Sequence, residues 1–240
     1  MYGIIQILYE KDVIQMNLFG RFLEASLPTE DIQESLAWYR LLGFSECSTG
    51  DIYDYHYAVV TDGRVSIGLH SAGITETCLT FVRPDLAHYL PALQKLGLQV
   101  DEVYQGEERF HELILHDSEG LQLRLLEART FSPKECDTIP LIGQLHNLGL
   151  TARHPVDASE FWQQGGFDSH ETEETNAFEL ILPGMTILLQ QGRSAPQLNF
   201  LCENKDLLLQ MLEKENLRYK KYGDEISMTS PEGLRINIYG

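Results

Sequence analysis

The segment DIQESLAWYRLLGF, residues 31–44, decides the fold, because the pattern around it recurs along the chain. Apolar residues at 32, 36, 39 and 42 follow the spacing of one helix face, and Gly43 is a typical stop signal. Strands are predicted on both sides of this helix, at 22–27 before it and at 44–49, 53–61 and 64–70 after it. The segment therefore predicts a βαβββ unit.

The same order of elements recurs three more times. In the second unit we predict a strand at 77–82, a helix at 85–97, and strands at 99–104, 109–116 and 121–127. Pro91 is awkward inside that helix, so the helix is expected either to begin later or to kink. In the second half, SEFWQQGGF at 159–167 echoes residues 36–44, and 187–190 echoes 67–70. Further echoes of the second unit lie at 197–202, 206–215 and 234–238. The repeats predict four units of about 50 residues.

The repeat divides the chain into two paired domains. We predict an N-terminal extension at 1–20, a first domain at 21–128, a linker at 129–139 and a second domain at 140–240. The extension carries apolar residues interrupted by Glu10, Lys11 and Asp12, which the apolar h-region of a signal peptide would not contain. It is expected to pack on the outside of the fold or on a partner subunit.

The charge of the chain excludes several classes of partner. The sequence contains 36 acidic and 18 basic residues, which gives a net charge of −18. Such a chain is repelled by nucleic acid and by anionic membrane surfaces, so neither is an expected partner. The four cysteines, Cys47, Cys78, Cys136 and Cys202, show no CxxC spacing. Free thiols in a reducing cytoplasm are expected.

These features resemble the vicinal oxygen chelate superfamily, which includes glyoxalase I, bleomycin-resistance proteins and extradiol dioxygenases. The resemblance rests on paired βαβββ units, on WYRLLGF at 38–44 and on the DSEG turn at 117–120. It covers 21–128 well and 140–240 less well. It implies an α+β fold with two glyoxalase/bleomycin-resistance-like domains, each with a cup-shaped mixed sheet. In metalloenzymes of this kind the cup holds a divalent ion, bound from the first, fourth, fifth and last strands.

Strand alternation assigns residues of this chain to those four positions. In the first domain they are Glu24, Gly68, Cys78 (or Thr77 one register over) and Arg124. In the second domain they are Asn147, Leu188, Gln197 and Asn237, with His146 reaching the cup after a one-residue slip. Guanidinium has no lone pair for a metal, and neutral amides are weak ligands. No cofactor is therefore expected, and a divalent metal enters only under the alternative below.

Several polar side chains are candidates for ligand binding instead. Glu24 and Arg124 are predicted to face one another, either as an anchor for a polar or zwitterionic ligand or as an ion pair that fills the cup. Tyr53, Tyr55 and Tyr57 alternate on one strand face, as a binding wall or as packing. The candidates are Glu24, Ser26, Tyr55, Tyr57, His70, Cys78, Arg124, Asn147, Gln197 and Asn237.

Three functions follow as expectations. The first is a protein that lacks the usual metal ligands and binds a small organic molecule in a cup. The second is a metal-dependent lyase, isomerase or extradiol-type dioxygenase with atypical ligands such as Glu24, His70 or His146. The third is a non-catalytic scaffold or interaction protein. The chain is expected to be a monomer or a homodimer, since two pairs of units in one chain can satisfy each other.

Overall fold

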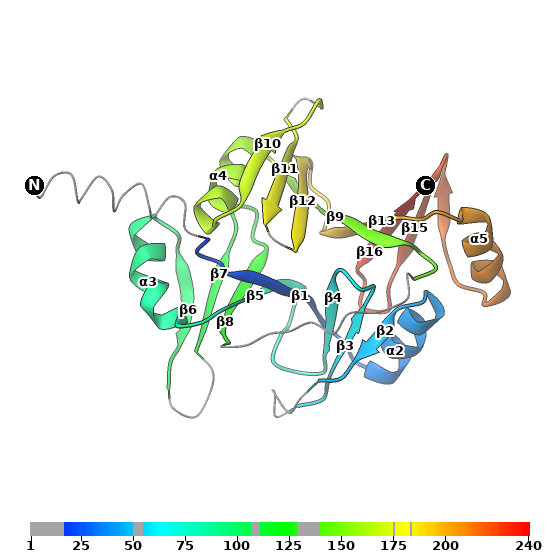
Figure 1. Cartoon of the computed structure of the whole chain (residues 1–240), viewed down its shortest axis with the longest axis horizontal. Helices are drawn as coiled ribbons and strands as arrows, with labels where there is room; N and C mark the ends of the chain where they lie inside the picture. Colours follow the sequence, from blue (N-terminus) through cyan, green and yellow to red (C-terminus); the bar gives the residue numbers. More distant parts are fainter. Residues whose placement is uncertain (1–16, 50–54, 107–110, 129–139, 175, 183) are drawn as a thin grey trace, which may run out of the picture.

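The computed structural model describes residues 17–49, 55–106, 111–128, 140–174, 176–182 and 184–240. The first unit comprises β1 (Arg21–Pro28), α2 (Ile32–Leu41), β2 (Ser45–Cys47), β3 (Tyr57–Thr61) and β4 (Ser66–His70). The second comprises β5 (Cys78–Arg83), α3 (Leu86–Lys95), β6 (Val100–Tyr104), β7 (Glu112–His116) and β8 (Gln122–Glu127). The third comprises β9 (Gln144–Ala152), α4 (Pro155–Gly165), β10 (Asp168–Glu171), β11 (Phe178–Leu182) and β12 (Met185–Gln191). The fourth comprises β13 (Gln197–Leu201), α5 (Lys205–Lys214), β14 (Lys220–Tyr222), β15 (Glu225–Thr229) and β16 (Arg235–Tyr239). The predicted α+β fold with four βαβββ units is confirmed (Figure 1).

Each pair of units forms one mixed sheet of eight strands. The strand order is β2-β3-β4-β1-β5-β8-β7-β6 in the first sheet and β10-β11-β12-β9-β13-β16-β15-β14 in the second. The first strands of the two units meet in antiparallel fashion at the centre, as β1 with β5 and as β9 with β13. Each of these strands also pairs in parallel with the last strand of its own unit. The two sheets are therefore equivalent strand by strand, so positions in one can be compared directly with positions in the other.

The helices differ from the sequence prediction mainly at their starts. α4 begins at Pro155, a favourable first residue because its missing N–H would have no partner there, and the predicted echo at 159–167 covered only its second half. α3 begins five residues before Pro91 and continues past it, so the helix does not start later. Pro91 is exposed, which lets water satisfy the carbonyl that loses its helical partner. No helix in the described ranges is long and apolar enough to cross a membrane.

Residues 17–20, the part of the predicted N-terminal extension that the structure describes, lie inside the molecule. Leu18 and Phe19 are fully buried, and the Phe19 ring lies 5.7 Å from that of Phe81 in β5 and 6.2 Å from that of Trp162 in α4. A Cβ on Gly165 would come within 2.1 Å of the Phe19 ring, so this helix end has no room for a side chain. Residues 17–20 thus pack between the domains, which corrects the expected outside position. Residues 1–16 and the predicted linker 129–139 lie outside the described residues.

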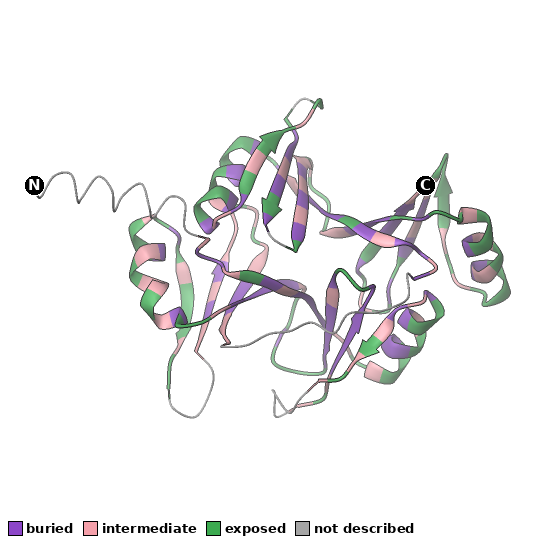
Figure 2. Cartoon of the chain, viewed as in Figure 1, coloured by how far each residue is buried: buried purple, intermediate pink, exposed green. Residues whose placement is uncertain are grey.

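The two sheets share one continuous core. Figure 2 shows the buried residues concentrated on the strands, while the helices keep an exposed side. The ring centroid of Phe44, which follows α2, lies 5.9 Å from the ring centroid of Phe200 in β13. The carboxylate of Asp62, which is 1% exposed, accepts bonds from Arg64 N at 2.8 Å and Val65 N at 2.7 Å within its own turn. Its second oxygen accepts from Leu145 N at 2.7 Å, in the other domain. A single carboxylate therefore closes the β3–β4 turn and joins the two domains.

Asp62→Asn is expected to lower the free energy of unfolding by about 2 kcal/mol, because an amide nitrogen cannot accept from a buried N–H. The residue would keep the turn bonds and lose the bond between the domains. Asp117→Asn is a matched control, since Asp117 accepts from Glu119 N and Leu121 N in the corresponding turn of the second unit. Urea unfolding of both variants checks the prediction. Equal losses in the two variants would show that the bond to Leu145 contributes nothing.

Candidate functional site

The two cups are built on equivalent rows of side chains. In the first sheet, Glu24, Thr80 and Arg124 stand in register on β1, β5 and β8. In the second sheet the same places on β9, β13 and β16 hold Asn147, Asn199 and Asn237. A register shift next to Glu24 and another next to Asn147 interrupt both central strand pairs at the same place. What differs between the cups is therefore the side chains and not the backbone.

The centre of the first cup is filled by the carboxylate of Glu24. Ser26 Oγ donates to it at 2.7 Å, His70 Nε2 lies 2.9 Å away, and the Tyr57 hydroxyl donates to its other oxygen. Glu24 and His70 are each 1% exposed. A Cβ on Gly68 would lie 2.2 Å from Glu24 Oε1, so the carboxylate rests directly on the backbone of β4. This carboxylate occupies the place that a ligand from the fourth strand would need.

The hydrogen-bonded network extends from Glu24 to the rim of the cup. Tyr55 OH lies 3.0 Å from His70 Nδ1, and Ser26 Oγ lies 2.7 Å from Thr80 Oγ1. Burial raises the pKa of the Tyr55 hydroxyl, an effect that the nearby Arg124 guanidinium partly offsets. At neutral pH Tyr55 is therefore a neutral hydroxyl that links Arg124 to His70.

Arg124 forms an ion pair that the sequence analysis did not anticipate. Its Nε donates to Glu112 Oε1 at 2.6 Å, and both side chains are largely buried. Glu112 is opposite Leu126 on β8, two residues from Arg124, so the pair is a diagonal cross-strand contact. Glu24 and Arg124 both face the cup, as predicted, with Thr80 between them in the row. Strand alternation in the sequence indicates that Glu112 and His111 point to opposite faces of the sheet, and Glu112 is the one on the cup face.

Cys78 has the wrong protonation state for a metal ligand or a nucleophile. Burial raises the pKa of its thiol to about 12, an effect that the Arg124 guanidinium partly offsets and the Glu24 carboxylate reinforces. A metal ligand or nucleophile is the thiolate, which is scarce at neutral pH when the pKa is this high. Cys78 is therefore a small neutral group in the polar network.

The second cup holds a ladder of asparagines. Asn199 Nδ2 donates to Asn147 Oδ1 at 2.7 Å, and Asn237 Nδ2 donates to Asn199 Oδ1 at 3.2 Å. Ser227 Oγ completes the ladder by donating to Asn237 Oδ1 at 2.9 Å. All three asparagines are buried. Asn199 was missed in the sequence, although it lies two residues beyond Gln197 and so on the same face.

The side chains present do not fit a divalent metal in either cup. In the second cup the three amide oxygens already accept hydrogen bonds within the ladder, and they carry no charge. In the first cup a guanidinium stands in the row with Glu24. The one-residue slip that would bring His146 into the cup does not occur: Asn147 enters the row, while His146 falls at the register shift and is exposed. Among the residues described, no three His, Cys, Asp or Glu side chains are grouped to hold a metal.

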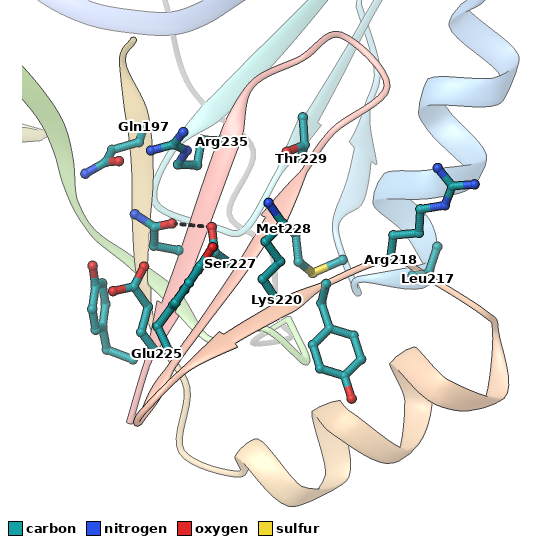
Figure 3. Close-up of a pocket in the computed structure, with 13 residues that line it drawn as sticks. Gln197, Leu217, Arg218, Lys220, Glu225, Ser227, Met228, Thr229 and Arg235 are labelled. Atoms are coloured by element: carbon teal, nitrogen blue, oxygen red, sulfur yellow. Dashed lines mark hydrogen bonds between the residues drawn. The ribbon is translucent and has the colours of Figure 1, made fainter. Parts of the chain in front are cut away.

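A large pocket lies beside the asparagine ladder. It has a volume of about 1000 Å³ and lies over β13, β14, β15 and β16, with the chain before β14 as its wall (Figure 3). Its lining includes Gln197, Arg218, Lys220, Tyr222, Glu225, Ser227, Thr229, Arg235, Asn237 and Tyr239. Of the predicted candidates, Gln197 and Asn237 line this pocket. Asn147 joins it through Asn199, and the other seven candidates lie in the first cup. Tyr53 lies outside the described residues.

The pocket carries positive charge in a strongly acidic protein. Arg218, Lys220 and Arg235 line it, and Glu225 is the one carboxylate among its described lining residues. None of the three cations has an ion pair or a side-chain hydrogen bond with another residue in the described part of the chain. The chain as a whole has a net charge of −18. Three cationic side chains therefore line this pocket without forming ion pairs to any residue that the structure describes.

Comparison with known proteins identifies the fold. No protein-family model and no curated protein matches the sequence. Catechol 2,3-dioxygenase has a similar structure, with a TM-score of 0.62, 12% identity, and coverage of 92% of this chain and 87% of that one. Homoprotocatechuate 2,3-dioxygenase from Brevibacterium fuscum, solved with 3,4-dihydroxyphenylacetate, gives a TM-score of 0.61, 14% identity and coverages of 92% and 80%. The 2,3-dioxygenase LapB from Pseudomonas sp. KL28 gives a TM-score of 0.58, 16% identity and 92% coverage of both chains. The chain therefore has the tandem two-domain fold of the extradiol dioxygenases, as the resemblance to the vicinal oxygen chelate superfamily predicted.

Proposed function

We propose that this protein binds a small organic anion in the pocket of the second cup, without a metal ion. The observation that carries the proposal is the uncompensated charge of Arg218, Lys220 and Arg235 in a cavity of about 1000 Å³. A protein with 36 acidic residues has ample acidic partners for these cations, yet in the described part of the chain none of them forms an ion pair with Arg218, Lys220 or Arg235. A bound anion supplies the missing charge.

The volume and the polar side chains of the pocket suit a small polar ligand. Its volume is at the upper end of the range for ligand pockets, about 300–1000 Å³. Arginine offers a planar pair of donors to a carboxylate or phosphate, and Gln197 and Asn237 offer amides that fix orientation. The net acidic charge of the protein repels anions in general, so binding is directed to this positively charged pocket.

The metal-dependent alternative rests on the fold, because the similar solved structures are dioxygenases. It requires anionic or imidazole ligands in one row of a cup, and the second cup offers a neutral amide ladder in that row. We therefore propose that the resident cofactor of such enzymes is not used here. Metal analysis of protein purified without chelator tests this: stoichiometric metal lost in Asn237→Ala would favour the enzyme.

Arg235→Gln is expected to weaken binding of an organic anion about tenfold or more, because a charge-assisted hydrogen bond contributes about 1.5–3 kcal/mol. The measurement is a thermal-shift screen of carboxylates and phosphate esters, followed by titration of each compound that stabilises the protein. Arg193→Gln is the matched control, since Arg193 is exposed, is outside the pocket lining and changes the net charge equally.

Two results would contradict the proposal. One is equal weakening in the two arginine variants, which would indicate a general charge effect. The other is the absence of stabilisation by any anion, which would favour the scaffold alternative.

A further inference from the structure

We infer that the ligand of this pocket is bipolar, with an anionic group at the Arg235 end and a cationic group at the Glu225 end. The inference rests on the proposed function and specifies its ligand class. The support for this inference is the strand register, which arranges the lining residues in rows across the sheet. The charge of these rows changes from positive in the first to negative in the last.

The first row is cationic. Arg235 on β16 lies beside Gln197 on β13 and beside Thr229 on β15. Figure 3 shows Arg235 and Gln197 together at one end of the pocket, with Arg218 on the opposite wall. Guanidinium, amide and hydroxyl groups side by side make a donor set for a carboxylate or a phosphate.

The middle row is mostly neutral. Ser227 is in register with Asn237 on one side and with Lys220 on the other. The Ser227 and Asn237 side chains bond to one another, so they offer a polar but uncharged floor. Figure 3 shows the amino group of Lys220 turned away from Glu225, so its charge adds to the cationic end.

The last row is acidic and aromatic. Glu225 is in register with Tyr222, and Tyr239 follows on the next strand. Burial raises the pKa of the Tyr239 hydroxyl, and the adjacent Glu225 carboxylate raises it further, so Tyr239 stays neutral at neutral pH. A carboxylate flanked by two tyrosine rings suits an ammonium group, which the charge and the ring faces both attract.

The spacing of the rows sets the length of the ligand. Arg235 and Tyr239 are four residues apart on one strand, a rise of about 13 Å at about 3.3 Å per residue. Side chains lean into the pocket from both ends and shorten this gap. A ligand with roughly eight atoms between its charged groups fits.

The experiment compares four probes of matched length by thermal-shift titration: 8-aminooctanoate, octanoate, octane-1,8-dioate and octyl phosphate. The parent protein is expected to bind 8-aminooctanoate about tenfold more tightly than octanoate and to bind the dioate least well. Glu225→Gln should remove the preference for 8-aminooctanoate over octanoate. Octanoate and octyl phosphate differ in the anion and by one carbon of the alkyl chain, so their ratio compares carboxylate with phosphate.

The variants separate failure of the inference from failure of the proposed function. If Arg235→Gln weakens every probe while the parent binds octanoate as well as 8-aminooctanoate, the bipolar inference is overturned and the anion site stands. If no probe binds to the parent, both are overturned. Unfolding midpoints of the two variants within a degree of the parent confirm that neither substitution acts through the fold.

Discussion

Glu24→Ala is expected to lower the free energy of unfolding by about 3–5 kcal/mol, the usual cost of removing one partner from a buried ion pair or its hydrogen-bonded equivalent. The substitution leaves three donors without their acceptor, on Ser26, Tyr57 and His70, in a site where His70 is 1% exposed. It also opens a cavity against the backbone of Gly68, which touches the carboxylate. Chemical unfolding in urea measures the loss.

A matched control is Glu46→Ala. Glu46 pairs with Arg40 on the surface, where the two side chains are 43% and 53% exposed, so its removal should cost less than about 1 kcal/mol. Glu24→Gln keeps the shape of the side chain and one acceptor oxygen. Its loss of unfolding free energy should therefore lie between those of the two alanine variants. A loss below about 1 kcal/mol for Glu24→Ala would contradict the description of the first cup as a polar core.

The two cups thus differ in what fills them. The first holds seven of the predicted ligand-binding candidates, among them Glu24, whose carboxylate is already hydrogen-bonded through both oxygens, and the network stabilises the domain. In the second, the pocket opens beside neutral amides and keeps its cations uncompensated. If this division holds, Glu24→Ala should change stability without changing the preference among ligands at the second cup.

Strand alternation in the sequence predicted which side chains face the cups. Period two along β1 put Glu24 and Ser26 on one face, and the structure joins them by a hydrogen bond. The same rule places Asn199 on the cup face, but the four positions implied by the family resemblance include Gln197 on this strand and not Asn199. The role of Glu112 needed the pairing of β7 with β8, which alternation within one strand does not supply.

The pocket could not be predicted from the sequence. Its cationic end combines Arg235 with Arg218, and these come from segments that meet only when β14 adds to the edge of the sheet. β14 is three residues long, with two lysines and a tyrosine, and no periodicity marks it as a strand. Register across four strands, rather than any local motif, brings the charges together.

Replacing Asn147 by His, Asn199 by His and Asn237 by Glu together is expected to create a divalent metal site, with Co²⁺ bound at least about 100-fold more tightly than by the parent. The three positions are in register on adjacent strands, and their side-chain ends already approach to 2.7 and 3.2 Å. Two imidazoles and a carboxylate at such spacing form the facial set that divalent iron and cobalt accept. Visible absorption of bound Co²⁺ and calorimetric titration measure the gain.

The single variant Asn199→His is the control, because one imidazole cannot hold the ion in the way that three ligands can. Without metal the triple variant should be less stable than the parent, since it buries ionisable groups in place of a satisfied amide ladder. Adding Co²⁺ should then restore stability by mass action. If the triple variant binds Co²⁺ no better than the single variant, the row does not converge on one point. In that case the backbone of the second cup, and not only its side chains, would be unsuited to a metal.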